Sequence, residues 1–233
     1  GFGKNDYIET TRPLVVVTAP GPGSGKMAVC LSQLYNEHVR GNQAGYAKFE
    51  TFPVWNLPLK HPINMAYEAA TADLNDVNMI DPYHLEAYGK TAVSYNRDTE
   101  IFPVLDALFT GIYGHNPYKS PTDMGVNMVG FCIDDDAACC EASKQEIIRR
   151  YYHALNDFAN GDISESVVNR IARLFKQVGI STADRRTTVA ANERKERNSA
   201  MAVAAIELHD GTIITAEASP LLGSSAALLL NAT

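Results

Sequence analysis

Several signatures of particular protein classes are absent from this sequence of 233 residues. Its apolar runs are far shorter than the roughly 20 residues that cross a bilayer, so no transmembrane helix or membrane association is expected. No basic stretch followed by an apolar one opens the chain, and we therefore expect no secretory signal peptide. A net charge of −7 argues against nucleic acid as the main partner.

Cysteine and histidine lack the spacing of metal sites. The four cysteines form no Cys-x-x-Cys pair, and Cys139 and Cys140 are adjacent, which suits neither a zinc ribbon nor a regular disulfide framework. We expect reduced, mostly packed thiols in a cytoplasmic protein. The six histidines show no metal-ligand spacing and no His-Glu-x-x-His motif, so no metal site is predicted from them.

The composition, with 45% hydrophobic and 20% charged residues, is that of an ordinary globular protein. Residue 1 is Gly, and the final residues "SSAALLLNAT" have the pattern of a helix without a cap. We therefore expect the chain to be a piece of a longer protein, with part of any active site outside it.

The first 135 residues are predicted to form an α/β region. Leu14–Thr18 has the apolar pattern of a buried strand in a parallel sheet, and Met27–Arg40 has helical spacing. A second strand is predicted within Gly45–Phe52, and a third at Met128–Ile133, just before three aspartates. A stiff proline-rich loop carries the only tryptophan, Trp55.

Further helices are expected at 64–74, from Asp81 and Pro82 onward, and at 100–113. Residues 136–199 are predicted as a helical subdomain of three helices, the last of them highly charged and solvated through its "ERKER" run. Residues 200–233 begin a third region, in which an Asp-Gly turn joins strands at 200–208 and 213–218, and a helix starts near Gly223.

The stretch "LVVVTAPGPGSGKMAVCLSQLY" has the order of a phosphate-binding P-loop, which is a strand, a glycine-rich loop, a lysine and a helix. Glycines let the backbone approach an anion, and the helix N-terminus adds about half a unit of positive partial charge. The predicted ligand-binding residues in this loop are Gly21, Gly23, Ser24, Gly25 and Lys26.

Two residues depart from the usual P-loop pattern. Pro20 stands where the first glycine is expected, and Met27 replaces the Ser or Thr that binds magnesium. Ser24 or an aspartate of 134–136 are alternative sources of a metal-binding oxygen. A degenerate P-loop whose binding depends little on magnesium is one interpretation, and a strand-to-helix turn that needs glycine only for its geometry is the other.

Asp81 and His84 flank the start of one predicted helix. They are candidates for a catalytic base and its orienting partner, and the alternative is a helix cap beside a surface histidine. Lys60 and His61 lie in the proline-rich loop, where a fixed cation would meet an anionic substrate.

Two further polar groups complete the candidate set. Tyr95, Asn96, Arg97 and Asp98 are consecutive, with Asn96 and Arg97 as candidate ligand-binding residues and Asp98 as a candidate catalytic residue. Lys119, Thr122 and Asp123 share a polar loop, and Asp123 is the fourth candidate catalytic residue. Each of these residues alone is more often simply solvated.

Five long segments of the chain are distinctive: "TAPGPGSGKMAVCLSQLY", "GYAKFETFPVWNLPLKHP", "ATADLNDVNMIDPYHLEAYGKTAVSYNRD", "YKSPTDMGVN" and "EASKQEIIRRYY". Together they resemble an uncharacterised bacterial family of longer cytosolic proteins, a domain of unknown function. The resemblance covers nearly the whole chain and implies additional sequence on both sides of it, but no established reaction. Some members carry the label of an ATP-dependent protease, whose zinc-binding helix has no counterpart here.

The segment "AVAAIELHDGTIITAEASPLLGSSAALLL" is similar to the opening hairpin and helix of cytidine-deaminase-like domains. Those domains carry zinc ligands and a catalytic Glu on the helix, whereas this chain has Ser224, Ser225, Ala226 and Ala227 there. A deaminase-like fold without zinc chemistry and an unrelated hairpin followed by a helix both stay open.

The sequence thus predicts an α/β protein that binds a small anionic or phosphorylated ligand, with ATP or another nucleotide as the candidate cofactor. An enzyme of unknown reaction is one expectation. A non-catalytic structural or regulatory assembly module is the alternative, and homo-oligomerisation stays open. An enzyme would bring Lys26 into one cleft with polar residues of 50–61, 81–98 or 119–123, and a structural module would bury or scatter them.

Overall fold

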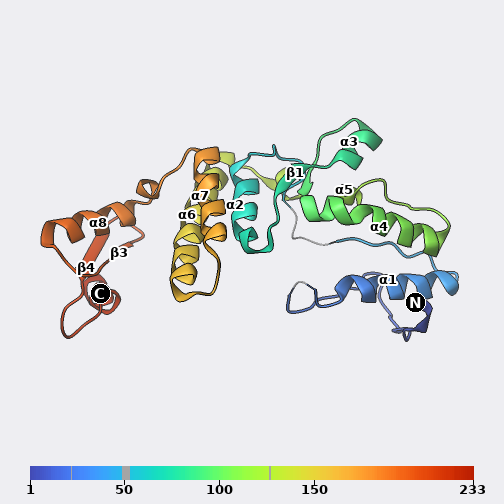
Figure 1. The fold of residues 1–233 in the computed structure, drawn as a ribbon, viewed down its shortest axis with the longest axis horizontal. Helices are drawn as coiled ribbons and strands as arrows, with labels where there is room; N and C mark the ends of the chain where they lie inside the picture. The colour runs from blue at the N-terminus through green and yellow to red at the C-terminus, as the bar shows by residue number, and fades with distance from the viewer. Residues whose placement is uncertain (22, 49–52, 126) are drawn as a thin grey trace. The chain divides into compact units, whose positions relative to one another are not determined.

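The computed structural model describes residues 1–21, 23–48, 53–125 and 127–233. The chain forms two compact units, Gly1–Asp134 and Asp135–Thr233 (Figure 1). Helices and two small antiparallel sheets make it an α/β protein in the broad sense. Within the described ranges, no helix has the length and apolarity needed to cross a bilayer. The predicted boundary at 135 differs by one residue from the division between the units, and the further boundary at 199 stays a prediction.

The first unit contains short strands among helices and 3₁₀ turns. Its elements are η1 (Phe2–Lys4), α1 (Lys26–Val39), α2 (Pro62–Ala70), η2 (Ala72–Leu74), β1 (Asn78–Ile80), α3 (Pro82–Tyr88), β2 (Val93–Tyr95), α4 (Asn96–Tyr113), α5 (Pro121–Met124) and η3 (Val129–Cys132). Strands β1 and β2 pair antiparallel, with Asn78 opposite Tyr95 and Ile80 opposite Val93.

The core of the first unit lies between α1 and α4. Apolar residues at helical spacing on each helix are buried there, together with Met124 of α5. They are Leu31 and Leu34 of α1 and Phe102, Leu105, Phe109 and Ile112 of α4. The predicted helix after the glycine-rich loop is therefore confirmed, and its apolar stripe anchors it to the unit.

Two predicted strands are wrong. Leu14–Thr18 is not a strand, and the residues Leu14 and Val16 are 76% and 70% exposed. An apolar β-branched run becomes a strand only when another strand supplies its hydrogen bonds, and no described residue does so here. The strand predicted at Met128–Ile133 is also absent. Residues 129–132 form the 3₁₀ turn η3 instead, in which Phe131 is exposed and Gly130 lies against the side chain of Asn56.

The strand predicted within Gly45–Phe52 lies partly outside the described residues, since 49–52 are not among them. In the part that is described, Lys48 makes a single parallel bridge with Gly125, and its N–H donates to Met124 O at 2.6 Å. The parallel sheet expected from the sequence is not found among the described residues, where both sheets are antiparallel.

The second unit begins with a helical hairpin, α6 (Asp136–Asn160) and α7 (Glu165–Val178). Ile147 and Ile148 of α6 and Ile171 and Leu174 of α7 are fully or almost fully buried, as their helical spacing predicts. Asp135 caps α6 by accepting the N–H of Ala138 at 2.9 Å. One of the three aspartates considered as a metal ligand thus has a capping role.

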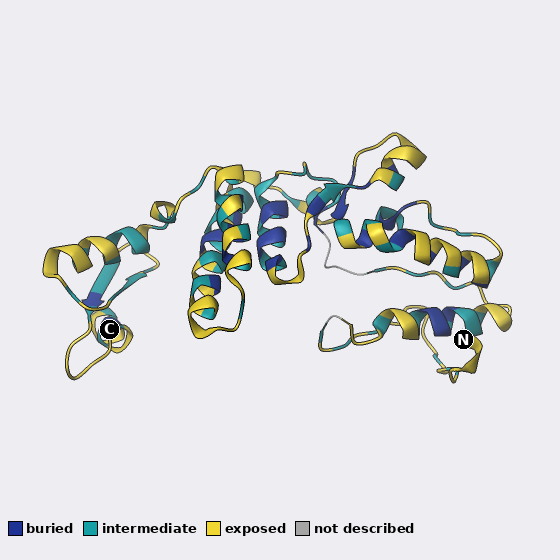
Figure 2. Cartoon of the chain, viewed as in Figure 1, coloured by how far each residue is buried: buried dark blue, intermediate teal, exposed yellow. Residues whose placement is uncertain are grey.

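A hairpin packed between two helices follows. After η4 (Thr182–Asp184) and α8 (Arg186–Asn198), β3 (Val203–Glu207) and β4 (Ile213–Glu217) pair antiparallel, and α9 (Ser224–Ala232) closes the chain. These elements confirm the predicted hairpin, its Asp-Gly turn and the helix after Gly223. No residue of α8 is buried, and Figure 2 draws this helix in yellow and teal, as expected for a solvated charged helix.

Candidate functional site

The glycine-rich loop leads directly into α1. Gly25 is the N-cap residue, with φ of 87° in the left-handed region, and no side chain caps the helix. Lys26 folds back over the loop, and its Nζ donates to Gly21 O at 2.8 Å. The Ser24 hydroxyl donates to the same oxygen. The loop therefore combines an ammonium group with a helix start that no described side chain caps.

Space around the loop is open. A Cβ atom built on Gly21, Gly23 or Gly25 would meet no other atom within 4 Å. Met27, at the position where a magnesium-binding hydroxyl is usual, offers no oxygen. Pro22 lies outside the described residues. Among the described residues, no atom beyond their chain neighbours covers the Cβ positions of these three glycines.

Asp81 is fully buried and serves as the N-cap of α3. Its Oδ1 accepts the N–H of His84 at 3.0 Å. Its Oδ2 accepts both the N–H of Thr122, at 3.1 Å, and the Thr122 hydroxyl, at 2.6 Å. The expected helix cap is thus confirmed, and the same carboxylate also holds the start of α5.

His84 lies in a buried network rather than on the surface, so the surface alternative is wrong for this residue. Its Nδ1 is 3.0 Å from the hydroxyl of Ser120 and 3.8 Å from Asp123 Oδ1. Ser120 has no exposed surface, and its hydroxyl accepts the Asp123 N–H at 3.1 Å. Because Ser120 and Asp123 face the same ring nitrogen, the three residues do not have the arrangement of a serine-hydrolase triad, which uses both nitrogens.

Asp123 is held from two further directions. Its Oδ2 accepts the hydroxyl of Tyr88 at 2.9 Å and the N–H of Lys119 at 2.7 Å. The hydrogen bond from the Tyr88 hydroxyl to Asp123, together with burial, raises the pKa of Tyr88. Three of the candidate catalytic residues, Asp81, His84 and Asp123, therefore lie in one network that joins α3 to α5.

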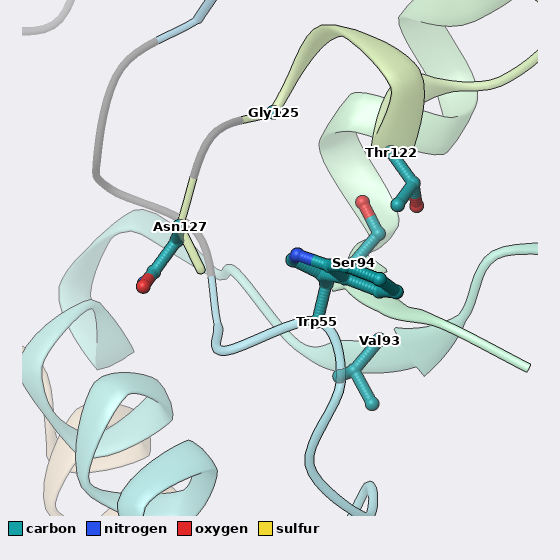
Figure 3. Close-up of a pocket in the computed structure, with 6 residues that line it drawn as sticks. All are labelled: Trp55, Val93, Ser94, Thr122, Gly125 and Asn127. Atoms are coloured by element: carbon teal, nitrogen blue, oxygen red, sulfur yellow. The ribbon is translucent and has the colours of Figure 1, made fainter. Parts of the chain in front are cut away.

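A small pocket lies beside this network (Figure 3). Its cavity volume is about 10 Å³, which is roughly the space that a single water molecule needs. In this view, the side chains of Ser94 of β2 and of Thr122 lie above the indole of Trp55, and Asn127 lies to its left. The ring of Trp55 also contacts His84, with centroids 6.2 Å apart. The remaining lining residues are Val93 and Gly125.

The first turn of α4 carries two ion pairs. Asp98 pairs with Lys48, and Arg97 Nη2 lies 2.8 Å from Asp76 Oδ2. Asn96 has a local structural role, since its Oδ1 accepts the N–H of Val77 at 2.8 Å.

Lys60 is exposed, whereas His61 is the N-cap of α2 and its Nδ1 accepts the N–H of Ile63 at 3.3 Å. The proposed anion-binding role of this pair stays a prediction. The only described hydrogen bond of Lys26 goes to its own loop, so no bond joins it to the candidate residues of 81–98 or 119–123. Segments 81–98 and 119–123 meet each other, whereas a cleft that also includes Lys26 stays a prediction.

Several central residues were not among the predicted ones. Asp76, Ser120 and Asn64 have at most 1% of their surface exposed, and each holds segments together through its side chain. Only the residue types could have signalled them, because a polar residue within an apolar core must find partners. Their partners depend on the tertiary fold, which local pattern does not specify.

Two descriptions of known families match the chain. Residues 1–179 match the domain of unknown function DUF1846, N-terminal, and residues 183–233 match its C-terminal counterpart. A UPF0371 protein of Corynebacterium urealyticum is 65% identical over 232 residues, which is 100% of this chain and 46% of that protein. UPF0371 proteins of Streptococcus pyogenes serotype M5 and Streptococcus thermophilus are 60% and 61% identical, again over 100% of this chain and 47% of each protein.

The chain therefore spans about half the length of the curated relatives that it matches. Their names assign no reaction. The resemblance to an uncharacterised bacterial family of longer proteins is confirmed, and the chain belongs to the DUF1846 family.

Proposed function

We propose that the loop Gly21–Lys26 and the first turn of α1 bind the phosphate group of a nucleotide or a phosphorylated small molecule. The observation that carries this proposal is the position of Lys26, whose ammonium group lies over the loop at an uncapped helix start. The whole protein is proposed to be an enzyme that uses this loop to hold its substrate or cofactor. The reaction itself is not assigned.

Two effects would attract an anion to this loop, and the conformation of its glycines keeps the backbone in place for them. The first N–H groups of α1 lack intrahelical partners and carry the positive end of the helix dipole. Lys26 adds a full positive charge, and a charge-assisted hydrogen bond contributes roughly 1.5–3 kcal/mol. The positive φ values of Gly23 and Gly25, 72° and 87°, hold the backbone in a conformation that L-residues rarely adopt.

A thermal-shift panel on the full-length protein tests the proposal. It should compare each phosphorylated compound with its unphosphorylated counterpart, such as ATP with adenosine and a sugar phosphate with the sugar. A bound ligand at a hundred times its dissociation constant stabilises the folded state by about 2.7 kcal/mol. We expect stabilisation only by phosphorylated members. Equal shifts within every pair, or no shift at all, would favour a turn in a non-catalytic module.

A further inference from the structure

Buried polar atoms without a hydrogen-bond partner gather in one stretch of the first unit. Five of the six such side-chain atoms found among the described residues lie between residues 76 and 98. They are Asp76 Oδ1, Asn78 Oδ1, Ser94 Oγ, Tyr95 Oη and Asp98 Oδ2. A buried polar atom normally finds a partner, so each exception calls for an ion, a water molecule or a chemical role.

The pairing of β1 with β2 brings two of these residues, Asn78 and Tyr95, side by side. Asn78 lies directly opposite Tyr95, so their side chains share one face of the pair. The Asn96 N–H donates to Val77 O at 3.0 Å, which extends the pairing and brings Asp76 beside Arg97. Ser94 precedes Tyr95 in the strand, faces the other way and lines the pocket of Figure 3.

Asp76, Tyr95 and Asp98 are close enough to influence one another electrostatically. Burial raises the pKa of Asp76, and the charge of Asp98 raises it further, against the opposing effects of Arg97 and Lys48. Burial likewise raises the pKa of Tyr95. The nearby Thr71 side chain opposes this rise, and the charges of Asp76 and Asp98 add to it. The charge of Asp98 thus acts on both Asp76 and Tyr95, as expected for groups that lie near one another.

The positive partners are more exposed than the carboxylates with which they pair. The side chains of Arg97 and Lys48 are 49% and 31% exposed, whereas those of Asp76 and Asp98 are 2% and 9% exposed. Each carboxylate uses one oxygen for its positive partner and keeps the other unpartnered and buried. An unpaired buried carboxylate oxygen is costly, so an occupant that accepts its lone pairs would stabilise the fold.

The unpartnered atoms decide the chemistry of that occupant. Two carboxylate oxygens and an amide carbonyl oxygen can only accept or ligate, and the phenol oxygen can also do so. An anion such as phosphate would be repelled by the two carboxylates. Carboxylate and amide oxygens are the ligands preferred by Ca²⁺ and Mg²⁺. We propose that Asp76 and Asp98 bind a hard divalent cation together with Asn78 and Tyr95, which share one face of the β1–β2 pair.

This site is separate from the proposed phosphate loop, and neither depends on the other. The histidine spacing that finds transition-metal sites in a sequence gives no sign of it, because its ligands are oxygens from 76–98. The expected role of the ion is to fix the start of α4 on the β1–β2 pair, next to the pocket that Ser94 lines.

Terbium luminescence is a direct test, because Tb³⁺ prefers the same oxygen ligands and is sensitised by a nearby tyrosine. The full-length protein, first stripped of metal with a chelator, is titrated with Tb³⁺ and then with Ca²⁺ and Mg²⁺ as competitors. We expect sensitised emission that Ca²⁺ displaces. Asp76→Asn and Asp98→Asn should each raise the apparent dissociation constant at least tenfold. Tyr95→Phe should reduce the emission.

Asp106→Asn is the matched control, since Asp106 is an exposed aspartate of the same helix α4. It should bind Tb³⁺ like the parent. If the Asn variants fail to fold, the melting temperature of the parent protein serves as the test. It must rise with Ca²⁺ or Mg²⁺ beyond the rise caused by NaCl at equal ionic strength. Absence of that rise, or Tb³⁺ binding that survives both Asn substitutions, would overturn the proposal.

Discussion

Thr122 donates two hydrogen bonds to one carboxylate oxygen of Asp81, from its N–H at 3.1 Å and from its hydroxyl at 2.6 Å. The other oxygen of Asp81 accepts the N–H of His84 and caps α3. A single buried side chain thus joins the start of α3 to the start of α5. The network of His84, Ser120 and Asp123 depends on that junction for its geometry.

Replacing Asp81 with Ala should destabilise the protein by about 2–4 kcal/mol, because it removes a helix cap and leaves buried donors unpaired. Urea denaturation measures this change. Asp73→Ala, at an exposed aspartate of η2, is the control and should change stability by less than about 0.5 kcal/mol. An equally small effect of Asp81→Ala would show that the carboxylate does not hold these helices together.

Asn64 makes a second prediction possible. Its fully buried side chain accepts the Val54 N–H at 2.7 Å and donates to Val54 O at 3.2 Å and to Pro58 O at 3.1 Å. Asn64→Ala should cost about 2–3 kcal/mol and speed hydrogen exchange at the Val54 amide. Exchange at Val54 as slow as in the parent would contradict this role.

Asn64 also shows where sequence-based prediction fails. The prolines of the loop suggested stiffness of the chain itself, but an amide from the following helix fixes the loop. By contrast, the cap formed by Asp81 before Pro82 was predictable, because both residues lie at the start of the helix that they stabilise. The hairpin turn at Asp210–Gly211 was predictable for the same reason.

The predicted strand at Leu14–Thr18 failed because a strand needs partners that its own sequence does not contain. The ion pairs Lys48–Asp98 and Arg97–Asp76 join residues 50 and 21 positions apart and could not be assigned from local pattern. In the candidate site, individual polar residues were therefore recognisable by type, whereas their grouping required the fold.

A pH dependence is expected from Glu146. Two hydrogen bonds from Arg149 and one from Arg150 lower the pKa of Glu146 from 4.5 to about 2. A lowered pKa stabilises the folded state above the unfolded value, and this contribution is lost as the pH falls from 4.5 towards 2. Because the side chain is 34% exposed, solvent screening limits the contribution to about 1 kcal/mol or less.

The test compares the parent with Glu146→Gln in urea denaturation at pH 6, 4 and 3. The Gln variant should be the less stable at pH 6, and the two curves should converge as the pH falls. A difference that stays constant across this range would show that ionisation of Glu146 contributes nothing to stability.

Nucleotide binding should depend little on magnesium, because Met27 cannot supply the oxygen ligand of an ordinary P-loop. Calorimetric titration of ATP with and without Mg²⁺ should give similar dissociation constants. Mg²⁺ bound at the proposed Asp76–Asp98 site would raise the melting temperature without changing that result. A strict requirement for Mg²⁺ in ATP binding would reveal an oxygen ligand near the loop.

The most direct measurement compares phosphate-ligand binding by the parent and by Lys26→Ala in the full-length protein. Lys90→Ala serves as the control, since Lys90 is another exposed lysine of the first unit. Loss of one charge-assisted hydrogen bond should raise the dissociation constant about tenfold or more, while the melting temperature moves little. A Lys26→Ala protein that binds every phosphorylated ligand as tightly as the parent would contradict the phosphate-binding loop.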